Sequence, residues 1–338
     1  MKISLVIPAH NCESTIGACL ASVAPLLEAG ELLEIICVDD GSIDASARII
    51  SSYPVTLVPG SGGGAGAARN LGWRAARGEW IWFIDSDCVA ERGALEKLRE
   101  LVDASDVAGV GGSYGNMNPQ SLVASLIHEE IVARHERMPQ LVNFLSTFNV
   151  LYRRAVLEEI GGFDECRYNG PGVAGPEDTD LAFRVVEAGY RLKFTQASRV
   201  KHFHLTHYGR YLRVQQRHGF YRVRLYLDHP QRAGGDSYSG PADHLQPPLA
   251  MLSLASAPLL LWPPFGWLPL MILILLIALQ LPLALRIARR TGSWKLLAYI
   301  PFGFLRAYCR GFGMTAGVIN FFLARRPTTP LVPCTSKI

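Results

Sequence analysis

The sequence predicts an α/β domain built on a mostly parallel sheet, followed by C-terminal membrane helices. Three observations predict this fold. Apolar, strand-like runs alternate with helical segments over residues 1–85, polar clusters stand where several of these runs end, and residues 245–285 contain no charged side chain or histidine. Strands that alternate with helices are typical of parallel sheets with crossover helices. A hydrophobic content of 49% provides a sizeable core and leaves apolar residues over.

Each strand and helix of this domain is expected from its local composition. Short runs rich in Ile, Leu, Val or Trp have the character of buried strands, and they are residues 3–8, 34–38, 55–58 and 80–84. Helices are expected over residues 11–27, capped by Ser14, and over 42–52, 67–77, 95–104, 153–160 and 178–188. Later strands are expected over residues 107–111, 190–194 and 199–204, whereas residues 113–150 allow no assignment.

Polar side chains follow three of the predicted strands. These clusters are His10-Asn11, Asp39-Asp40 and Asp85-Ser86-Asp87. In open α/β sheets, ligands bind outside the carboxyl ends of the strands. The three clusters are therefore expected to meet at one edge of the sheet and to form a binding site there.

The acidic clusters suggest a cation and a nucleotide as ligands. Asp85 and Asp87 stand two residues apart and can reach a shared cation, and Mg²⁺ and Mn²⁺ prefer such oxygen ligands. A lone Asp-x-Asp is more often a solvated turn, but this one follows an apolar strand beside other carboxylates. Asp39 and Asp40 open a helix, where one residue suffices as a cap. The second carboxylate is free to accept a hydrogen bond from a base or a ribose.

A glycine-rich loop over residues 62–66 precedes a helix that carries Arg69. Glycines allow close approach of the backbone to a ligand, and helix N-termini favour phosphate. Arg69 is a candidate partner for a diphosphate. The loop matches neither the Walker pattern nor the complete dinucleotide fingerprint, so a mobile loop without a ligand is the alternative.

Two further groups of residues are candidates for catalysis and metal binding. Glu177 and Asp178 open a predicted helix, where acidic residues commonly interact with the helix dipole. A catalytic base must expose its carboxylate to the substrate, and Asp178 is the first choice, with Glu177 in reserve. His202 and His204 share one face of a predicted strand, so one of them is a candidate metal ligand.

Taken together, these motifs resemble the family-2 glycosyltransferases of the GT-A fold. The resemblance covers about residues 3–225 and rests on an ordered series of short motifs. They are Val-Ile-Pro-Ala-His-Asn at 6–11, Val-Asp-Asp-Gly-Ser at 38–42, Gly-Ala-Ala-Arg-Asn-Leu-Gly at 66–72, Phe-Ile-Asp-Ser-Asp at 83–87, Gly-Gly-Phe-Asp-Glu at 161–165 and Glu-Asp-x-Asp-Leu-x-x-Arg at 177–184.

The resemblance implies a role for each matched residue. The nucleotide sugar would be held by Pro8, His10, Asn11, Asp39, Asp40, Arg69, Asp85 and Ser86. His10 stands where the family often has an aromatic residue that stacks on the base. The divalent metal, Mg²⁺ or Mn²⁺, would be bound by Asp87, Asp85 and His202, and the acceptor site would be bordered by Gly162, Phe163 and Asp164. Asp178 matches the catalytic base, and the family inverts configuration at the anomeric carbon.

One departure from the family bears on the product. Processive polysaccharide synthases carry Gln-x-x-Arg-Trp after the base, whereas this chain has Gln-Gln-Arg-His-Gly at 215–219, without Trp. The difference favours transfer of a single sugar. The alternatives are a sugar nucleotidyltransferase and a non-catalytic membrane scaffold of the same fold. The first is expected to carry an N-terminal glycine-rich basic loop, and residues 1–11 contain one lysine and no glycine.

The C-terminal charge pattern indicates a membrane. Nine of the 33 Lys and Arg follow Asp243, and none of the 29 Asp and Glu does. A basic tail suits nucleic acid or an anionic membrane, and the uncharged stretch beside it favours the membrane and no nucleic acid. Residues 245–285 are long enough for two passes that turn at Pro263 and Pro264. That hairpin would return the basic residues to the side of a cytoplasmic catalytic domain, at the inner or plasma membrane.

The remaining expectations concern the tail, the linker and the cysteines. Residues 296–323 carry Arg306 and Arg310 one turn apart, which predicts an interfacial helix with both arginines toward lipid phosphates. A lipid-linked or saccharide acceptor would fit this position. The first arm of the hairpin is short and contains Pro258, so a re-entrant arm is the alternative to a spanning one. Scattered cysteines, and a start that has strand character rather than that of a signal peptide, favour the cytosol.

The expected division of the chain follows from these assignments. Residues 1–95 form the nucleotide-sugar-binding half of the catalytic domain and residues 96–227 the acceptor-binding half. Residues 228–247 are a linker, and residues 248–326 form the membrane region. Within that region the hairpin covers about 249–285 and the interfacial or third helix about 296–323.

Overall fold

The computed structural model describes residues 1–168 and 175–323. Its contacts divide the chain into two compact units. Unit 1 comprises residues 1–117 and 138–203, and unit 2 comprises residues 118–137 together with those from His204 onward. Unit 2 therefore takes one segment from within the sequence of unit 1 and the rest from the C-terminal part of the chain. Each unit is described separately below.

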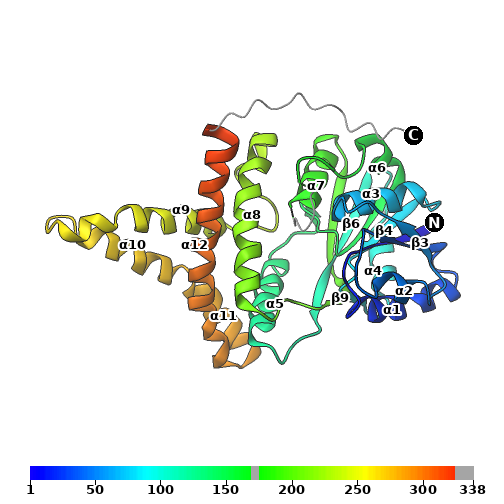
Figure 1. The fold of residues 1–338 in the computed structure, drawn as a ribbon, viewed down its shortest axis with the longest axis horizontal. Coiled ribbons are helices and arrows are strands. Elements are labelled where there is room, and N and C mark those ends of the chain that lie inside the picture. Colours follow the sequence, from blue (N-terminus) through cyan, green and yellow to red (C-terminus); the bar gives the residue numbers. More distant parts are fainter. Residues whose placement is uncertain (169–174, 324–338) are drawn as a thin grey trace. The chain divides into compact units, whose positions relative to one another are not determined.

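Unit 1 is organised around one sheet (Figure 1). Its strands are β1 (Ile3–Ala9), β2 (Glu34–Asp39), β3 (Thr56–Pro59), β4 (Trp80–Ile84), β5 (Cys88–Ala90), β6 (Val107–Asn116), β7 (Leu141–Val142), β8 (Asn149–Arg153) and β9 (Arg191–His202). They lie in the order β3-β2-β1-β4-β8-β6-β9-β5, and β7 pairs with β9. The expected α/β sheet is confirmed.

The sheet is mixed rather than mostly parallel. Strands β3, β2, β1 and β4 run parallel, whereas β8 is antiparallel to both β4 and β6. Strand β9 is parallel to β6 and antiparallel to β5 and β7. In the parallel half, Ala9 pairs with Asp39 and Val6 with Phe83, so β1, β2 and β4 end at nearly the same level. The polar residues that follow these strands consequently meet at one edge.

Helices cover both faces of this sheet. One face packs on α1 (Ile16–Glu28), α2 (Ser46–Ile50) and α4 (Ala94–Arg99). The other face packs on α3 (Ala65–Ala75), α6 (Arg154–Ile160) and α7 (Glu177–Glu187). Successive side chains of a strand point to opposite faces, and Leu5 and Ile7 accordingly join the first core while Val6 joins the second. The continuous apolar runs of the sequence reflect this burial on both sides.

Unit 2 is helical. It contains α5 (Leu122–His135), α8 (Tyr208–Asp228), a 3₁₀ turn η1 (Pro230–Arg232), α9 (Pro241–Ala255), a 3₁₀ turn η2 (Ala257–Leu261), α10 (Trp267–Ala278), α11 (Leu281–Thr291), η3 (Trp294–Ala298), α12 (Tyr299–Val318) and the π-helical turn η4 (Ile319–Leu323). Helices α8 and α12 lie side by side (Figure 1). Glycines at the interface allow this approach, because a Cβ at Gly313 would collide with the backbone carbonyl of Gln216.

Several expected elements have different bounds in the structure. Residues 113–150, which the sequence left unassigned, complete β6 and contain α5, β7 and part of β8. The two strands expected over residues 190–194 and 199–204 are one strand, β9. Helix α1 begins at Ile16 after Thr15, without a side-chain cap from Ser14. The expected linker over residues 228–247 contains η1 and the start of α9, because Asp236 and Asp243 bind Arg222 and Arg134 there.

The expectation that Arg306 and Arg310 face lipid phosphates is wrong. The side chain of Arg306 is 2% exposed and pairs with the buried carboxylate of Glu130 on α5. Arg310 donates from Nε to Gln215 Oε1 at 2.7 Å. A buried guanidinium requires a partner carboxylate, and the sequence does not show that α5 supplies one. The apolar side of α12, rather than the charged side, faces outward.

Only one helix in the described part of the chain is long and apolar enough to cross a membrane. It runs from Trp267 to Thr291 and joins α10 to α11. The first arm of the expected hairpin does not form a second such helix, because α9 ends at Ala255 and a 3₁₀ turn containing Pro258 follows.

Candidate active site

The residues predicted from strand ends meet at one edge of unit 1. Asp39 is the last residue of β2, His10 follows β1, and Asp85 follows β4. Since β1 lies between β2 and β4, His10 stands between the two acidic clusters. Pro8, by contrast, lies inside β1 and is buried in the sheet. The shared edge brings groups from distant parts of the sequence into one site.

Asp40 fixes the glycine-rich loop. Its carboxylate accepts backbone N–H groups from Gly62 at 2.8 Å, Gly63 at 3.1 Å and Gly64 at 2.7 Å, and the residue is 5% exposed. Backbone donors around a buried carboxylate stabilise its charge. The loop is thereby held over the start of α3, and Asp40 has a structural role whether or not it also contacts a ligand.

The loop after β1 is tied to the loop after β2. Asn11 adopts a positive φ of 48°, a conformation that asparagine tolerates better than most residues. Its Oδ1 accepts the N–H of Ile43 at 2.9 Å, and its own N–H donates to Ser42 Oγ at 2.9 Å. His10 Nδ1 lies 2.8 Å from the carbonyl oxygen of Asp40, which orients an exposed imidazole ring at the edge of the site. Its exposed face is available for stacking.

Arg69 bridges the acidic cluster after β4 to the start of α7. One guanidinium nitrogen donates to Asp85 Oδ1 at 2.8 Å and the other to Glu177 Oε1 at 3.0 Å. Burial raises the pKa of Glu177 to about 7, although Arg69 acts to lower it. Burial would lower the pKa of Arg69, but Asp85 and Glu177 outweigh it and raise that pKa. A diphosphate would have to compete with these two carboxylates for Arg69.

Asp178 is held beside this bridge in a defined rotamer. Its Oδ2 accepts Ser146 Oγ at 2.8 Å, and its Oδ1 accepts the N–H of Thr179 at 2.7 Å. Burial raises the pKa of Asp178 above its ordinary value, against the lowering effect of Ser146. Glu177 is 6% exposed, whereas Asp178 is half-buried, so Asp178 is the more accessible carboxylate of the pair. Ser146 was not predicted, and no pattern in residues 113–150 indicates it.

Asp87 and His202 form the centre of a candidate metal site. Asp87 Oδ2 lies 3.2 Å from His202 Nε2, and Cys88 completes a group whose ligand atoms lie within 4.8 Å of one another. The pairing of β5 with β9 places Cys88 opposite His202 and creates this proximity. Asp85 instead points to Arg69, and Ser86 stands half-buried between the two aspartates. The predicted set of Asp87, Asp85 and His202 is thus brought together only in part, and His204 belongs to unit 2.

The segment after α6 is fastened to α3. Asn70 Nδ2 donates to the carbonyl of Phe163 at 2.8 Å, and Asn70 Oδ1 accepts the N–H of Phe163 at 3.0 Å. Phe163 itself is 3% exposed and packs edge-on against Phe83, 5.5 Å between ring centroids. Asp164 accepts backbone N–H groups of the following turn, from Cys166 at 2.9 Å and Arg167 at 2.7 Å. Phe163 therefore supports the site from the core instead of lining it.

The absence of a side chain at Gly162 allows the segment after α6 to lie close to α3. Alanine substitutions at Gly162 and at its neighbour Gly161 form a matched pair that tests this contact. Gly162 has φ +72° and Gly161 has φ +83°, but a Cβ at Gly162 would meet Asn70 and lie 2.8 Å from Trp73 Nε1, whereas nothing lies within 4 Å at Gly161. Gly161→Ala should cost about 1–2 kcal/mol of backbone strain. Gly162→Ala should cost about 1–3 kcal/mol more, from the collision. Thermal unfolding of both variants measures the difference, and equal losses would contradict the proposed contact.

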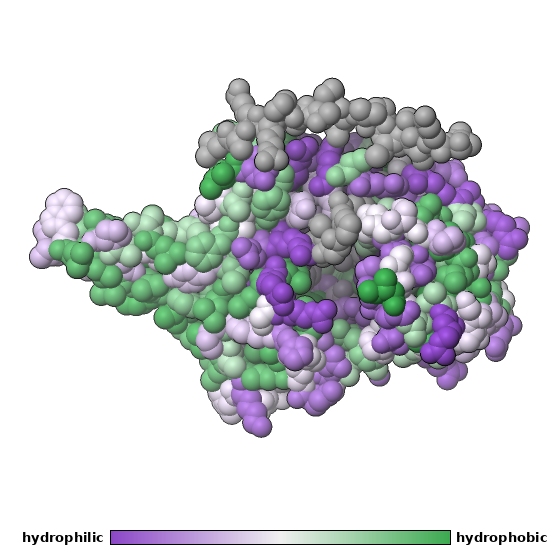
Figure 2. Space-filling view, in the orientation of Figure 1, coloured by the Kyte–Doolittle hydropathy of each residue, from purple (hydrophilic) through white to green (hydrophobic). Residues whose placement is uncertain are grey.

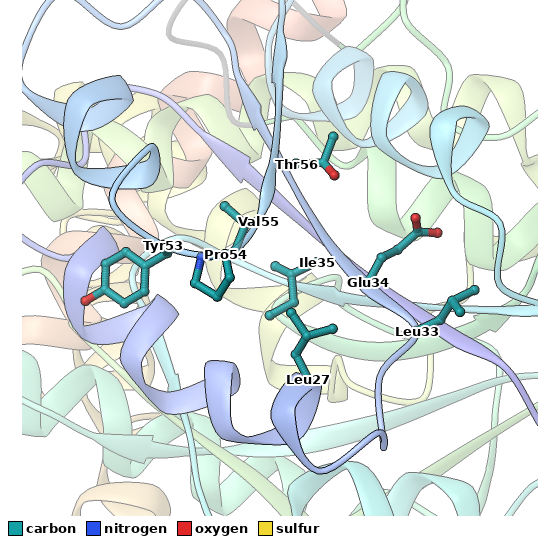
Figure 3. Close-up of a pocket in the computed structure, with 8 residues that line it drawn as sticks. All are labelled: Leu27, Leu33, Glu34, Ile35, Tyr53, Pro54, Val55 and Thr56. Carbon is teal, nitrogen blue, oxygen red and sulfur yellow. The ribbon is translucent and has the colours of Figure 1, made fainter.

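A separate hollow lies at the opposite end of the strands. It is lined by Leu27, Leu33, Glu34, Ile35, Tyr53, Pro54, Val55 and Thr56 (Figure 3). Glu34 and Thr56 are the first residues of β2 and β3, so this hollow lies away from the edge that carries Asp39. Glu34 is also engaged by Ser4 and Arg77. The hollow is not part of the candidate site.

Fold and site define a GT-A type domain, with acidic residues at the carboxyl ends of parallel strands and a second acidic pair on α7. Residues 4–161 match the sequence model of Glycosyl transferase family 2. This matched segment, which is a little under half of the chain, is similar to the family-2 glycosyltransferases.

Comparison with known proteins agrees with this family. The chain is 28% identical over 215 residues to "Probable glycosyltransferase YdaM" of Bacillus subtilis, covering 58% of this chain and 49% of that protein. It is 28% identical over 253 residues to "Pre-mycofactocin glycosyltransferase" of Mycobacterium tuberculosis, covering 71% of this chain and 51% of that protein. The chain spans about half the length of these curated relatives.

A mannosyltransferase of known structure is similar along nearly the whole chain. It is the mannosyltransferase PcManGT from Pyrobaculum calidifontis in complex with GDP-Man and Mn²⁺, with a TM-score of 0.59 at 20% identity. The similarity covers 95% of this chain and 87% of that one. At this identity the likeness establishes the shared fold.

Proposed function

We propose that this protein is an inverting, metal-dependent glycosyltransferase that moves one sugar from a nucleoside-diphosphate sugar to a hydroxyl or phosphate acceptor. The observation that carries the proposal is the Arg69 bridge. Arg69 lies 2.8 Å from Asp85, at the end of a parallel strand, and 3.0 Å from Glu177. Glu177 is the neighbour of Asp178 in the sequence. Carboxylates separated by about 90 residues of sequence thus surround one small volume, with Asp87 and His202 next to it.

Asp178 acts as the general base in this proposal. The acceptor oxygen attacks the anomeric carbon of the sugar, and the bond from that carbon to the diphosphate oxygen breaks. The acceptor proton passes to an oxygen of Asp178, and the electron pair leaves with the nucleoside diphosphate. A single displacement of this kind inverts configuration and needs no covalent enzyme intermediate. A general base works best when its pKa lies near the operating pH. Burial raises the pKa of Asp178 and so moves it in that direction.

The residues beside Asp85 fit a divalent cation, Mg²⁺ or Mn²⁺. An aspartate oxygen and an imidazole nitrogen face each other at 3.2 Å between Asp87 and His202, where a shared cation would replace their direct contact. Carboxylate oxygen and imidazole are suitable ligands for Mn²⁺, and a metal bound there would offset the charge of the leaving diphosphate. Burial raises the pKa of the Cys88 thiol well above its ordinary value, which makes it a poorer ligand than Asp87.

The nucleotide would occupy the edge formed by β1 and β2. His10 offers an exposed ring for stacking, and Asp39 offers a carboxylate at the end of its strand. Gly162 and Asp164 would border the acceptor. We place the acceptor among lipid-linked or saccharide molecules and the protein at the inner or plasma membrane, with its catalytic domain in the cytoplasm. The basic, acid-free sequence after Asp243 supports that placement.

Removal of the metal or of its aspartate tests the function. Detergent-solubilised protein is incubated with uridine-, guanosine- and thymidine-diphosphate sugars, and release of the nucleoside diphosphate is measured. Chelation should abolish release, and added Mn²⁺ or Mg²⁺ should restore it. Asp87→Asn should raise the metal concentration needed for half-maximal rate by roughly tenfold or more, since one of few ligands is weakened.

A matched control for this experiment is Asp103→Asn. Asp103 precedes β6 and pairs with Lys193, at the opposite end of β6 and β9 from His202. The metal dependence of the Asp103→Asn variant should equal that of the parent. Unchanged release after chelation, together with an Asp87→Asn variant that behaves like the parent, would exclude the proposed metal-dependent mechanism.

A further inference from the structure

The apolar surface of unit 2 is gathered on two adjoining features. One is the α9–α10 hairpin, comprising residues 249–278, which projects as a mostly apolar arm (Figures 1 and 2). Large side chains along it are open to solvent, including Leu261 at 91%, Ile274 at 63% and Trp262 at 57%. A contiguous group of exposed large apolar side chains is typical of an interaction surface.

The second feature is a stripe along α12 and η4. It consists of Pro301, Leu305, Phe312, Ala316 and Ile319, which are all exposed and recur at helical spacing. Tyr308 lies between Leu305 and Phe312 on this side, and its hydroxyl is 2.7 Å from Ser253 Oγ of α9. The base of the hairpin is thus fastened to α12 beside the stripe, and the two features adjoin.

The charges of α12 point the other way. Arg306 pairs with Glu130, and Arg134 joins Glu130 and Asp243 at 2.5 Å. These groups lie in the interior of unit 2, with relative exposures of 2% for Arg306 and 5% for Glu130. Polar groups inside and apolar groups outside are the reverse of the usual arrangement in water, and this reversal suits a hydrocarbon surrounding.

We propose that unit 2 is embedded in a single leaflet of an anionic bilayer, with the α9–α10 hairpin in the hydrocarbon and the α12 stripe at its surface. The inference rests on the membrane placement in the proposed function and replaces a spanning hairpin with a monotopic one. The occupant of the apolar surface is a lipid leaflet.

The length of the hairpin limits its depth. Helix α10 has 12 residues, which is about 18 Å at 1.5 Å per residue. The hydrocarbon core is about 30 Å thick, so one leaflet offers about 15 Å. Helix α11 continues from α10 but does not lengthen the part that could enter the membrane. Its residues Ala284 and Ile287 are buried in a core cluster of unit 2, together with Leu126, Tyr211 and Phe302.

The tip of the hairpin is built for a medium without water. Trp267 Nε1 donates to the carbonyl of Pro264 at 3.1 Å. The backbone N–H groups of Trp262, Phe265 and Leu268 donate to carbonyls three residues earlier, at 2.9, 2.9 and 3.0 Å. Pro263 and Pro264 have no N–H to satisfy. Backbone polar groups in hydrocarbon must be satisfied internally, so these bonds favour a tip inside the bilayer over one that emerges on the far side.

Charge complementarity favours lipid over a second copy of the chain. Arg286, Arg289 and Lys295 are exposed on α11 and η3, beside the exposed Trp294. No acidic residue occurs in the sequence after Asp243. Two such basic surfaces repel each other, whereas anionic headgroups attract them.

Flotation with vesicles tests the surface without any nucleotide sugar, so its outcome is independent of catalysis. Full-length protein should float with vesicles of phosphatidylethanolamine and phosphatidylglycerol, and less with phosphatidylcholine alone. Ile274→Asp should reduce binding by roughly tenfold or more, since a charged side chain is strongly disfavoured in hydrocarbon. Leu305→Asp should also weaken binding, by a smaller factor, since it lies at the surface of the hydrocarbon. Leu141→Asp, at an apolar residue of unit 1 that is 52% exposed, is the matched control and should float like the parent.

Tryptophan quenching then measures depth. Lipids brominated near the chain ends should quench the parent more than lipids brominated near the headgroup. The double variant Trp262→Phe, Trp267→Phe should lose this deep quenching while unfolding at the parent's temperature. Quenching of the tip by iodide trapped inside the vesicles would show a spanning hairpin. Unaltered flotation of both Asp variants, with loss of a dimer instead, would show a second copy; either result overturns the proposal.

Discussion

Replacement of Asp178 by asparagine should lower the rate of sugar transfer by roughly 10²–10⁴-fold, which is the usual contribution of a general base. An amide has the shape of the carboxylate but cannot take the acceptor proton. The local structure should persist, because the amide oxygen can still accept the N–H of Thr179, and the amide nitrogen can donate to Ser146 Oγ. Binding of the nucleotide sugar should change little.

The measurement separates turnover from binding. Initial rates give kcat, and titration with the nucleoside diphosphate gives its Kd. Glu187→Gln is the matched control, since Glu187 is exposed at the far end of the same helix, α7. Its rate should equal that of the parent. An Asp178→Asn variant whose transfer rate is within a few-fold of the parent's would show that Asp178 is not the base. Glu177 would then be the next candidate for the base.

Replacement of Arg306 by methionine should destabilise unit 2 by about 3–5 kcal/mol, the cost of breaking a buried ion pair on one side. Glu130 would keep Arg134 but lose Arg306, and burial would then favour its protonated form. At present the neighbouring arginines lower the pKa of Glu130 to about 2, although burial acts to raise it. The free energy of unfolding in detergent measures the loss.

The double variant Glu130→Gln, Arg306→Met should recover part of this loss, because the buried carboxylate that loses Arg306 is then neutral. Arg289→Met is the control, since Arg289 is exposed on α11 and should affect stability little. An Arg306→Met variant with parental stability but weaker vesicle binding would restore the orientation expected from the sequence, with Arg306 toward lipid.

The edge of the sheet could be predicted from the sequence because it depends on local order. Strand composition fixes where β1, β2 and β4 end, and parallel neighbours place Asp39 and Asp85 at the same edge. The bridge through Arg69 could not be predicted, because Glu177 lies 108 residues further along the chain. Helical spacing showed that Arg306 and Arg310 share a side of α12, but only the position of Glu130 decides which side faces inward.

The helices of unit 2 were less predictable for a related reason. Helix α5 has no strong one-sided apolar pattern, because it buries Glu130, Arg134 and His135 alongside Ala124 and Leu126. Its partners come from α9 and α12, more than 100 residues away. Residues 228–247 were expected to be a linker because they are rich in Gly, Pro, Ser and Asp, although the carboxylate of Asp243 binds Arg134.

The path of the chain between the two units limits how the protein can be shortened. The chain passes from one unit to the other near residues 117, 137 and 203. A protein cut after β9 would keep α5 but lose α9 and α12, and Glu130 and Arg134 would be left without Arg306 and Asp243. Such a fragment would contain α5 in the middle of its sequence without the helices that α5 packs against. A water-soluble version of unit 1 therefore requires excision of residues 118–137 and a new loop in their place, as well as removal of the tail.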